Sequence, residues 1–107
     1  MNYRVLVLPR ADDQLVASAQ WWSERHSSVE AIRWLDGFRT ALEGLCVDPE
    51  RLPLAREDQF FPFTVRQLLY GSGRKKTHRA LFEVRDDEVL VFAVRHLHQR
   101  DVSSEDD

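Results

Sequence analysis

The stretch KKTHRALFEVRDDEVLVFAVRHLHQRD, from Lys75 to Asp101, decides how this chain folds. Two runs rich in apolar and β-branched residues flank the polar turn Arg85-Asp86-Asp87-Glu88, a pattern that predicts a β-hairpin. Basic and titratable residues crowd the open end of this hairpin. They are Lys75, Lys76, His78, Arg79, Arg95, His96, His98 and Arg100. The sequence therefore predicts that one end of one hairpin gathers most of the basic groups of this region.

The alternation of side chains predicts what each face of the hairpin carries. A turn centred on Asp86-Asp87 places Val84 opposite Val89, and directly opposed residues share a face. The first face should receive helices, because it is apolar: Ala80, Phe82, Val84, Val89, Val91, Ala93 and Leu97. The second face holds Lys75, Thr77, Arg79, Leu81, Val94, His96 and His98. Arg79 is thus predicted to face solvent as a diagonal neighbour of His96, and only a bulge or an odd-length turn would reverse this parity.

Two helices are predicted upstream of the hairpin, over residues 11–26 and 28–47. The first has apolar residues at helical spacing: Ala11, Leu15, Ala19 and Trp22. Ser27 followed by Glu30 is a capping box that begins the second helix. The apolar stripe of that helix is predicted to be Ile32, Leu35, Phe38, Leu42 and Leu45. So short a connection makes the two helices an antiparallel hairpin.

Strands are predicted at Tyr3–Leu8 and at Phe63–Tyr70, with a loop over residues 48–62. The element order is then β-α-α-β-β-β. Such a chain buries its apolar faces as an α+β fold, with the helical hairpin packed on one face of a mainly antiparallel twisted sheet. We expect one domain over residues 1–101, followed by an acidic tail over residues 102–107.

Composition excludes several classes of protein. Cys46 is the only cysteine, so the chain forms no internal disulfide and no site of paired cysteines for a metal. No apolar run is long enough to span a bilayer, and we expect a cytoplasmic protein with no membrane partner. Residues 62–100 hold eight Lys or Arg against four Asp or Glu, an excess that suits a polyanion or a solvated sheet edge.

The basic hairpin end has the residue types that metal-free RNA cleavage requires. Histidine transfers protons near neutral pH, and arginine offers forked donors to phosphate oxygens. The predicted catalytic residues are Arg79, His98, His96 and Arg66, and the predicted nucleic-acid-binding residues are Lys75, Lys76, Tyr70, Arg95 and Arg100. Alternation along Phe63–Tyr70 places Arg66 and Tyr70 on the same open face as Arg79. No metal and no cofactor is expected, because His96-Leu97-His98 has no third ligand at a suitable spacing and GSGRKK is not a phosphate-binding loop.

Several motifs in this order resemble the RelE/ParE superfamily of type II toxin–antitoxin toxins. YRVLVLPRADDQL resembles the opening strand and first helix of that family, and AIRWLDGFRTALEGLCVDP resembles its second helix. VRQLLYG, HRALFEVRDDEVLVFAVRH and HLHQRD are similar to its closing strands and terminal motif. The resemblance covers residues 3 to about 101.

The resemblance implies a growth-inhibiting toxin that a cognate antitoxin holds inactive. RelE-like members cut mRNA on the ribosome, and ParE-like members inhibit DNA gyrase. Arg79 matches the active-site arginine of nuclease members, and His98 falls where some of them carry a terminal tyrosine. Leu52 and Gln67 depart from the Glu and Lys that nuclease members often carry, and HLHQRD also resembles the ParE-type ending. The leading hypothesis is an mRNA interferase; the alternatives are a gyrase inhibitor without enzymatic activity and a binding module whose activity has decayed.

Overall fold

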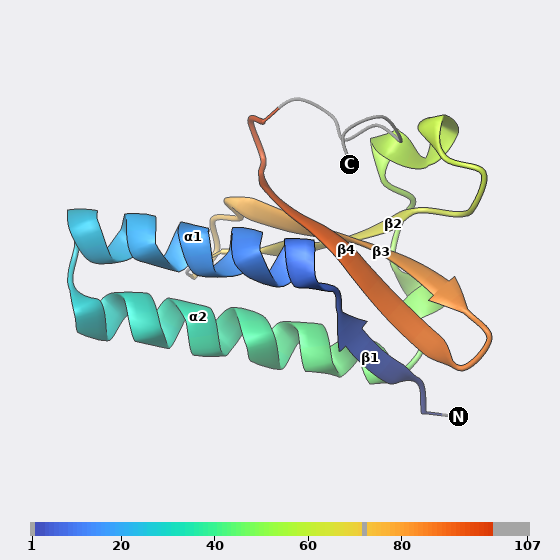
Figure 1. Ribbon diagram of the computed structural model, residues 1–107, viewed down its shortest axis with the longest axis horizontal. Helices are drawn as coiled ribbons and strands as arrows, with labels where there is room; N and C mark the ends of the chain where they lie inside the picture. The colour runs from blue at the N-terminus through green and yellow to red at the C-terminus, as the bar shows by residue number, and fades with distance from the viewer. Residues whose placement is uncertain (1, 72, 100–107) are drawn as a thin grey trace.

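The computed structural model describes residues 2–71 and 73–99 and has the predicted order of elements (Figure 1). The strands are β1 (Arg4–Val7), β2 (Arg66–Tyr70), β3 (His78–Arg85) and β4 (Glu88–His96). The helices are α1 (Pro9–Arg25) and α2 (Ser28–Glu43). Three short 3-10 turns, η1 (Gly44–Cys46), η2 (Pro49–Arg51) and η3 (Arg56–Phe60), lie in the connection that follows α2.

The four strands form one sheet in the order β1-β4-β3-β2. β1 pairs with β4 in parallel, and the other two pairs are antiparallel. α1 and α2 lie side by side on one face of the sheet (Figure 1). The predicted α+β fold, a helical hairpin on a mainly antiparallel sheet, is therefore confirmed.

Sequence patterns explain where α2 begins and which faces of the two helices are buried. The Ser27 hydroxyl oxygen accepts a hydrogen bond from the Glu30 backbone N–H at 3.1 Å, which is the predicted cap of α2. α1 buries Ala11, Leu15 and Ala19 and half-buries Trp22. α2 buries Ala31, Trp34, Phe38 and Leu42. The predicted place of Ile32 in this stripe is wrong: Ile32 is 60% exposed, because Trp34 fills the core position instead.

The β3–β4 hairpin contains a bulge that changes the predicted faces. Val84 pairs with Val89 and Phe82 with Val91, as predicted, but Leu81 then pairs with Ala93. β4 thus has one extra residue, Phe92, at the shift between Leu81 and Phe82. Every β4 residue beyond the bulge consequently lies on the face opposite to its prediction.

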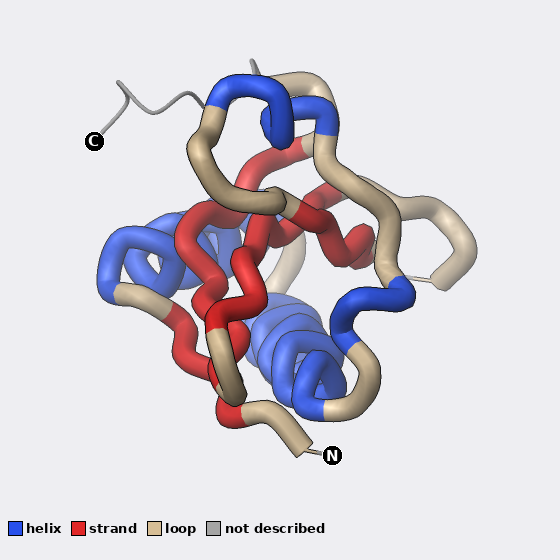
Figure 2. The backbone as a smooth tube through the Cα atoms, turned by 90° about the vertical axis from the view of Figure 1, so that its right-hand side faces the viewer, coloured by secondary structure: helices blue, strands red, loops and turns tan. Residues whose placement is uncertain are grey.

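A second apolar cluster covers the sheet face that lies away from the helices. Its buried members are Ala55, Val65, Leu81 and Ala93, and Phe61, Phe63 and Phe92 pack against them. Ala93 was predicted on the helix face; the bulge turns it to this one. The segment that carries η3 therefore folds over a face predicted to be open (Figure 2). No helix within residues 2–71 and 73–99 is long and apolar enough to cross a membrane.

Candidate functional site

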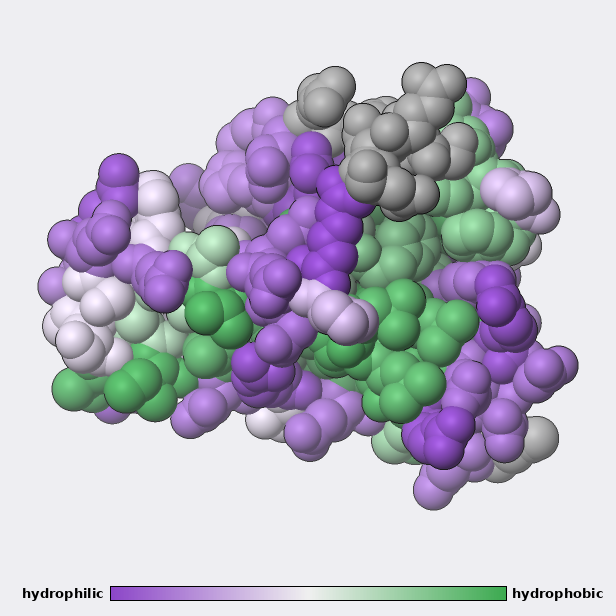
Figure 3. All heavy atoms as spheres, in the orientation of Figure 1, coloured by the Kyte–Doolittle hydropathy of each residue, from purple (hydrophilic) through white to green (hydrophobic). Residues whose placement is uncertain are grey.

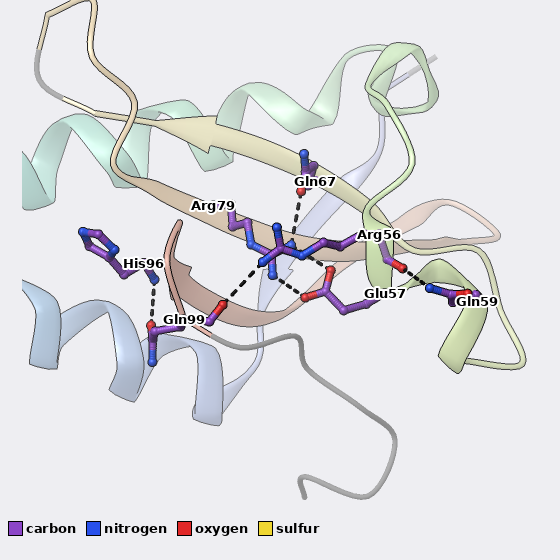
Figure 4. Close-up of polar contacts among 7 residues, drawn as sticks. All are labelled: Arg56, Glu57, Gln59, Gln67, Arg79, His96 and Gln99. Atoms are coloured by element: carbon purple, nitrogen blue, oxygen red, sulfur yellow. Dashed lines mark hydrogen bonds and ion pairs between the residues drawn. The ribbon is translucent and has the colours of Figure 1, made fainter.

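Arg79 lies on β3, on the face away from the helices, and the segment carrying η3 covers it (Figure 4). Its exposed fraction is 1%, and that of Glu57 is 0%. One Arg79 guanidinium nitrogen donates to Glu57 Oε1 at 2.7 Å, and the other forms a short contact with Glu57 Oε2. Gln67 Oε1 accepts a further hydrogen bond from Arg79 at 3.3 Å. The prediction that Arg79 faces solvent is wrong, because η3 brings a buried carboxylate onto it.

Neighbouring side chains tie the same segment to the end of the sheet. The Arg56 guanidinium, on η3, donates to the backbone carbonyl of Gln99 at 3.4 Å. Gln59 donates to the Arg56 carbonyl at 3.3 Å (Figure 4). Arg95 is the β4 residue directly opposite Arg79. These contacts form a polar cluster in which the Arg79–Glu57 pair is the buried centre.

The other predicted catalytic residues do not share a face with Arg79. His96 pairs with His78, which shares the helix-facing side of β3 with Ala80 and Phe82, and the bulge turns His96 to that same side. Arg66 pairs with Phe82 on the helix side and donates to the Leu52 carbonyl at 2.6 Å. The prediction of one patch is wrong for these residues, since the bulge and the register of β2 separate them.

His98 is exposed and follows the end of β4. Its backbone N–H donates to His96 Nδ1 at 3.2 Å, and the two rings lie 5.3 Å apart. It therefore lies beside His96 and not beside the buried guanidinium. The catalytic roles themselves stay predictions, because no contact of the structure tests them.

The predicted nucleic-acid-binding residues are also dispersed. Lys75 and Lys76 are exposed in the connection between β2 and β3, and Arg95 is half-buried. Tyr70 was predicted on the open face, which is wrong: its ring stacks on Phe38 at 4.5 Å, beneath α2. Burial raises the pKa of the Tyr70 phenol, whose hydroxyl donates to the Trp34 carbonyl at 3.2 Å. Arg100 and the acidic tail lie outside the described residues.

A cavity of about 600 Å³ lies between α1 and the ends of β3 and β4, and the sequence did not predict it. We name it the histidine cavity. The residues that line it are Gln14, Ala17, Ser18, Trp21, Trp22, His26, Thr77, His78, Val94, His96 and Gln99. The nearest sequence signal was the pair Trp21-Trp22, but only the bulge in β4 brings His96 to the same side.

Burial makes His78 a neutral imidazole at physiological pH. Its exposed fraction is 7%, and its ring lies 5.0 Å from that of Trp34. Desolvation, with a smaller contribution from His96, lowers the pKa of His78 to about 4. His78 Nδ1 lies 2.8 Å from the Thr77 hydroxyl oxygen. A neutral ring at this place suits hydrogen bonding and ring packing rather than charge pairing.

Within the part of the chain that the structure describes, no group of three or more His, Cys, Asp or Glu side chains is arranged to hold a metal ion. The imidazoles pack on one another and on tryptophan rings, with 5.2 Å between the His78 and His96 rings and 4.2 Å between those of Trp22 and His26. The chemistry available is therefore that of a buried ion pair on one face and of a cavity with hydrogen-bonding walls on the other.

Comparisons with known proteins point to one family. A family model described as "ParE toxin of type II toxin-antitoxin system, parDE" matches residues 5–101. Ten chains of solved structures match, among them one titled "Chromosomal ParDE TA system from P. aeruginosa". That match has a TM-score of 0.71 at 14% identity and covers 90% of this chain and 97% of the other, so it shows a shared fold. No curated protein sequence gives a significant match.

Proposed function

The chain belongs to the ParE toxin family of type II toxin–antitoxin systems, and from this we propose that it inhibits growth by binding DNA gyrase, not by cutting mRNA. The buried Arg79–Glu57 pair carries this proposal. A nuclease needs a cation that can reach a phosphate, and Arg79 is the residue that the resemblance to nuclease members assigns to this role. Its guanidinium is instead held by both oxygens of one carboxylate.

The energetic cost of freeing Arg79 supports the same conclusion. Opening the pair would break both contacts between Arg79 and a fully buried carboxylate, and breaking a buried pair typically costs about 3–5 kcal/mol. A phosphate would have to offset that cost and also displace the η3 segment that covers the guanidinium. A rigid, buried pair is better suited to fixing η3 on the sheet than to catalysis.

The separation of the proton-transfer residues is a second support. General acid–base catalysis needs its groups within hydrogen-bonding reach of the reacting atoms. His96 lies on the helix side of the sheet, whereas Arg79 lies on the side that η3 covers. A single phosphodiester cannot contact both. A binding mechanism makes no such demand, and we expect it to operate in the cytoplasm, where gyrase acts.

We expect a cognate antitoxin to neutralise the toxin, as the family implies. Apolar residues are exposed near the tip of the helical hairpin, where Trp21 is 49% exposed and Val29 and Ile32 also face outward. In Figure 3 a small group of hydrophobic residues lies along the lower edge of that end of the molecule, among hydrophilic residues. An amphipathic segment of the antitoxin would cover this tip and pair its acidic residues with the exposed Lys75 and Lys76.

The two modes of action give different results in one pair of assays. After a short induction in cells, we expect intact transcripts by primer extension, together with a DNA-damage response. With purified proteins, the toxin should inhibit gyrase supercoiling, and added antitoxin should reverse the inhibition. Transcripts cut at ribosome-protected codons, with supercoiling unaffected, would show that the toxin is an mRNA interferase.

His98 provides a matched test, because it is exposed and its imidazole is the predicted proton donor. If the toxin acts by binding gyrase elsewhere, His98→Ala should leave inhibition within about twofold of the wild type. A catalytic proton donor is typically worth about 10²–10⁴ in rate. A loss of that size in His98→Ala, at unchanged thermal stability, would support nuclease activity.

A further inference from the structure

The histidine cavity has the size and the walls of a small-molecule site. Its volume of about 600 Å³ lies within the range of roughly 300–1,000 Å³ that is usual for such sites. Ala17, Trp21, Trp22 and Val94 supply an apolar wall. A ligand that fills this space needs an apolar body, because an ion alone would leave most of the cavity to water.

The polar wall of the cavity has more donors than acceptors. The Gln14 side-chain oxygen accepts from the Val94 backbone N–H at 2.8 Å, and the Gln99 oxygen accepts from the His96 N–H at 2.7 Å. Each amide therefore keeps its NH₂ group to donate. His96 Nδ1 accepts from the His98 N–H, so the proton of a neutral His96 ring lies on Nε2. These three side chains all line the cavity and all have a donor to offer.

The charge of the lining residues narrows the class of ligand. Asp and Glu are absent from the lining residues, so a cation would have no counter-ion there. Lys and Arg are absent too, so a doubly charged phosphate would lack the cations it usually requires. A wholly apolar ligand would bury donors without acceptors, at a cost of about 1–3 kcal/mol each. A singly charged carboxylate on an apolar body satisfies all of these conditions.

We propose that the histidine cavity binds a small organic carboxylate, with the carboxylate toward Gln14, His96 and Gln99 and the apolar body between the tryptophans of α1 and Val94. This proposal does not rest on the proposed binding of gyrase. The rings of His78 and His98 lie 5.2 Å and 5.3 Å from the ring of His96, so imidazoles flank the donor that would receive the carboxylate.

Three probes of nearly equal shape test the proposal: 1-naphthylacetate, the uncharged 1-naphthylacetamide and the cationic 1-naphthylmethylamine. Titration calorimetry on the purified toxin should give at least tenfold tighter binding of the carboxylate than of the amide, and no measurable binding of the amine. Nuclear magnetic resonance should show the carboxylate shifting the ring signals of His78, His96 and Trp22. Equal binding of the three probes, or no binding of the carboxylate at any pH between 6 and 8, would overturn the assignment.

Two substitutions on α1 locate the site. Ala17→Trp adds a large ring to a residue that lines the cavity, and it should abolish binding of 1-naphthylacetate. Val16→Trp is the matched control, because Val16 is exposed on the same helix and does not line the cavity. Thermal unfolding of both variants shows whether they are folded. Binding of 1-naphthylacetate that persists in Ala17→Trp would contradict the proposal. The proposal would also be contradicted if the wild type binds no probe and Ala17→Trp loses binding of the antitoxin, because the cavity would then be a contact surface for a protein.

A pair of substitutions at His96 tests the donor. Glutamine keeps a hydrogen-bond donor at the end of the side chain, whereas phenylalanine keeps a ring without a donor. His96→Gln should retain binding of 1-naphthylacetate, and His96→Phe should weaken it at least tenfold. Equal binding by the two variants would exclude His96 as a donor to the carboxylate.

Discussion

Replacing Arg79 with alanine is expected to destabilise the fold of the toxin, not to remove a catalytic group. The substitution leaves the Glu57 carboxylate, which is 0% exposed, without the two contacts that neutralise it. Breaking a buried ion pair by removing one partner costs about 3–5 kcal/mol. A domain typically has only about 5–15 kcal/mol of stability, so this loss is a large fraction of the total. At roughly 4 °C per kcal/mol, the melting temperature should fall by roughly 12–20 °C.

A double substitution separates the structural role from a catalytic one. Arg79→Met together with Glu57→Leu removes both charges and fills the space with apolar side chains of similar volume. Replacing a buried pair in this way is often neutral or stabilising. We therefore expect the double variant to recover most of the stability lost in Arg79→Ala and to inhibit growth as the wild type does.

The assay combines urea unfolding of the purified variants with induction in cells. Unfolding should be followed by tryptophan fluorescence, since Trp34 is buried in the core. The reasoning is refuted if Arg79→Ala unfolds at the same urea concentration as the wild type. It is also refuted if the double variant is as stable as the wild type but no longer inhibits growth, because Arg79 would then act through its charge.

Three further outcomes follow from individual contacts. Gly37→Ala should lower the free energy of unfolding in urea by about 1–3 kcal/mol, because the added Cβ lies 2.2 Å from the Tyr70 hydroxyl oxygen. Adding Tyr70→Phe removes that oxygen and should restore most of the lost stability; a double variant as unstable as Gly37→Ala would contradict this explanation. The pKa of His78 is lowered from 6.5 to about 4, so its stabilising contribution is complete above pH 6.5 and is lost as the pH falls toward 4, on the order of 3 kcal/mol. His78→Phe should flatten that part of the stability–pH profile, and an unchanged profile would exclude His78 as its source. Antitoxin association measured by stopped flow should slow with added salt, and Lys75→Ala with Lys76→Ala should weaken that dependence; a rate indifferent to salt would remove these lysines from the interface.

The order of elements and the helix that caps at Ser27 could be predicted because they depend on local patterns. A capping box, a periodic spacing of apolar residues and a polar turn each involve only a few neighbouring residues, so each can be recognised in the sequence. The pairing of Val84 with Val89 followed from the turn in the same way. The amphipathic pattern of α2 was less informative, since Ile32 and Trp34 lie two residues apart and only packing against the sheet decided between them.

The candidate site could not be predicted as well, because each of its errors comes from a long-range contact. One extra residue in β4 reverses the face of His96, and nothing local to Phe92 signals a bulge. The burial of Arg79 depends on Glu57, which lies 22 residues away on a segment predicted to be a loop. Lys75, Lys76 and His98 are exposed, but Arg79, which was predicted to face solvent, is buried.

The sequence by itself determined the α+β architecture and the sheet-forming hairpin, because local propensity and periodicity specify which elements form, and its motifs carried the resemblance to the family. Only the tertiary structure decided which side chains meet. The parity of a strand changes with a single inserted residue, and whether Arg79 can reach a ligand depends on the segment that covers it. The sequence predicted one catalytic face, whereas the structure has a buried ion pair on one side of the sheet and a histidine-lined cavity on the other.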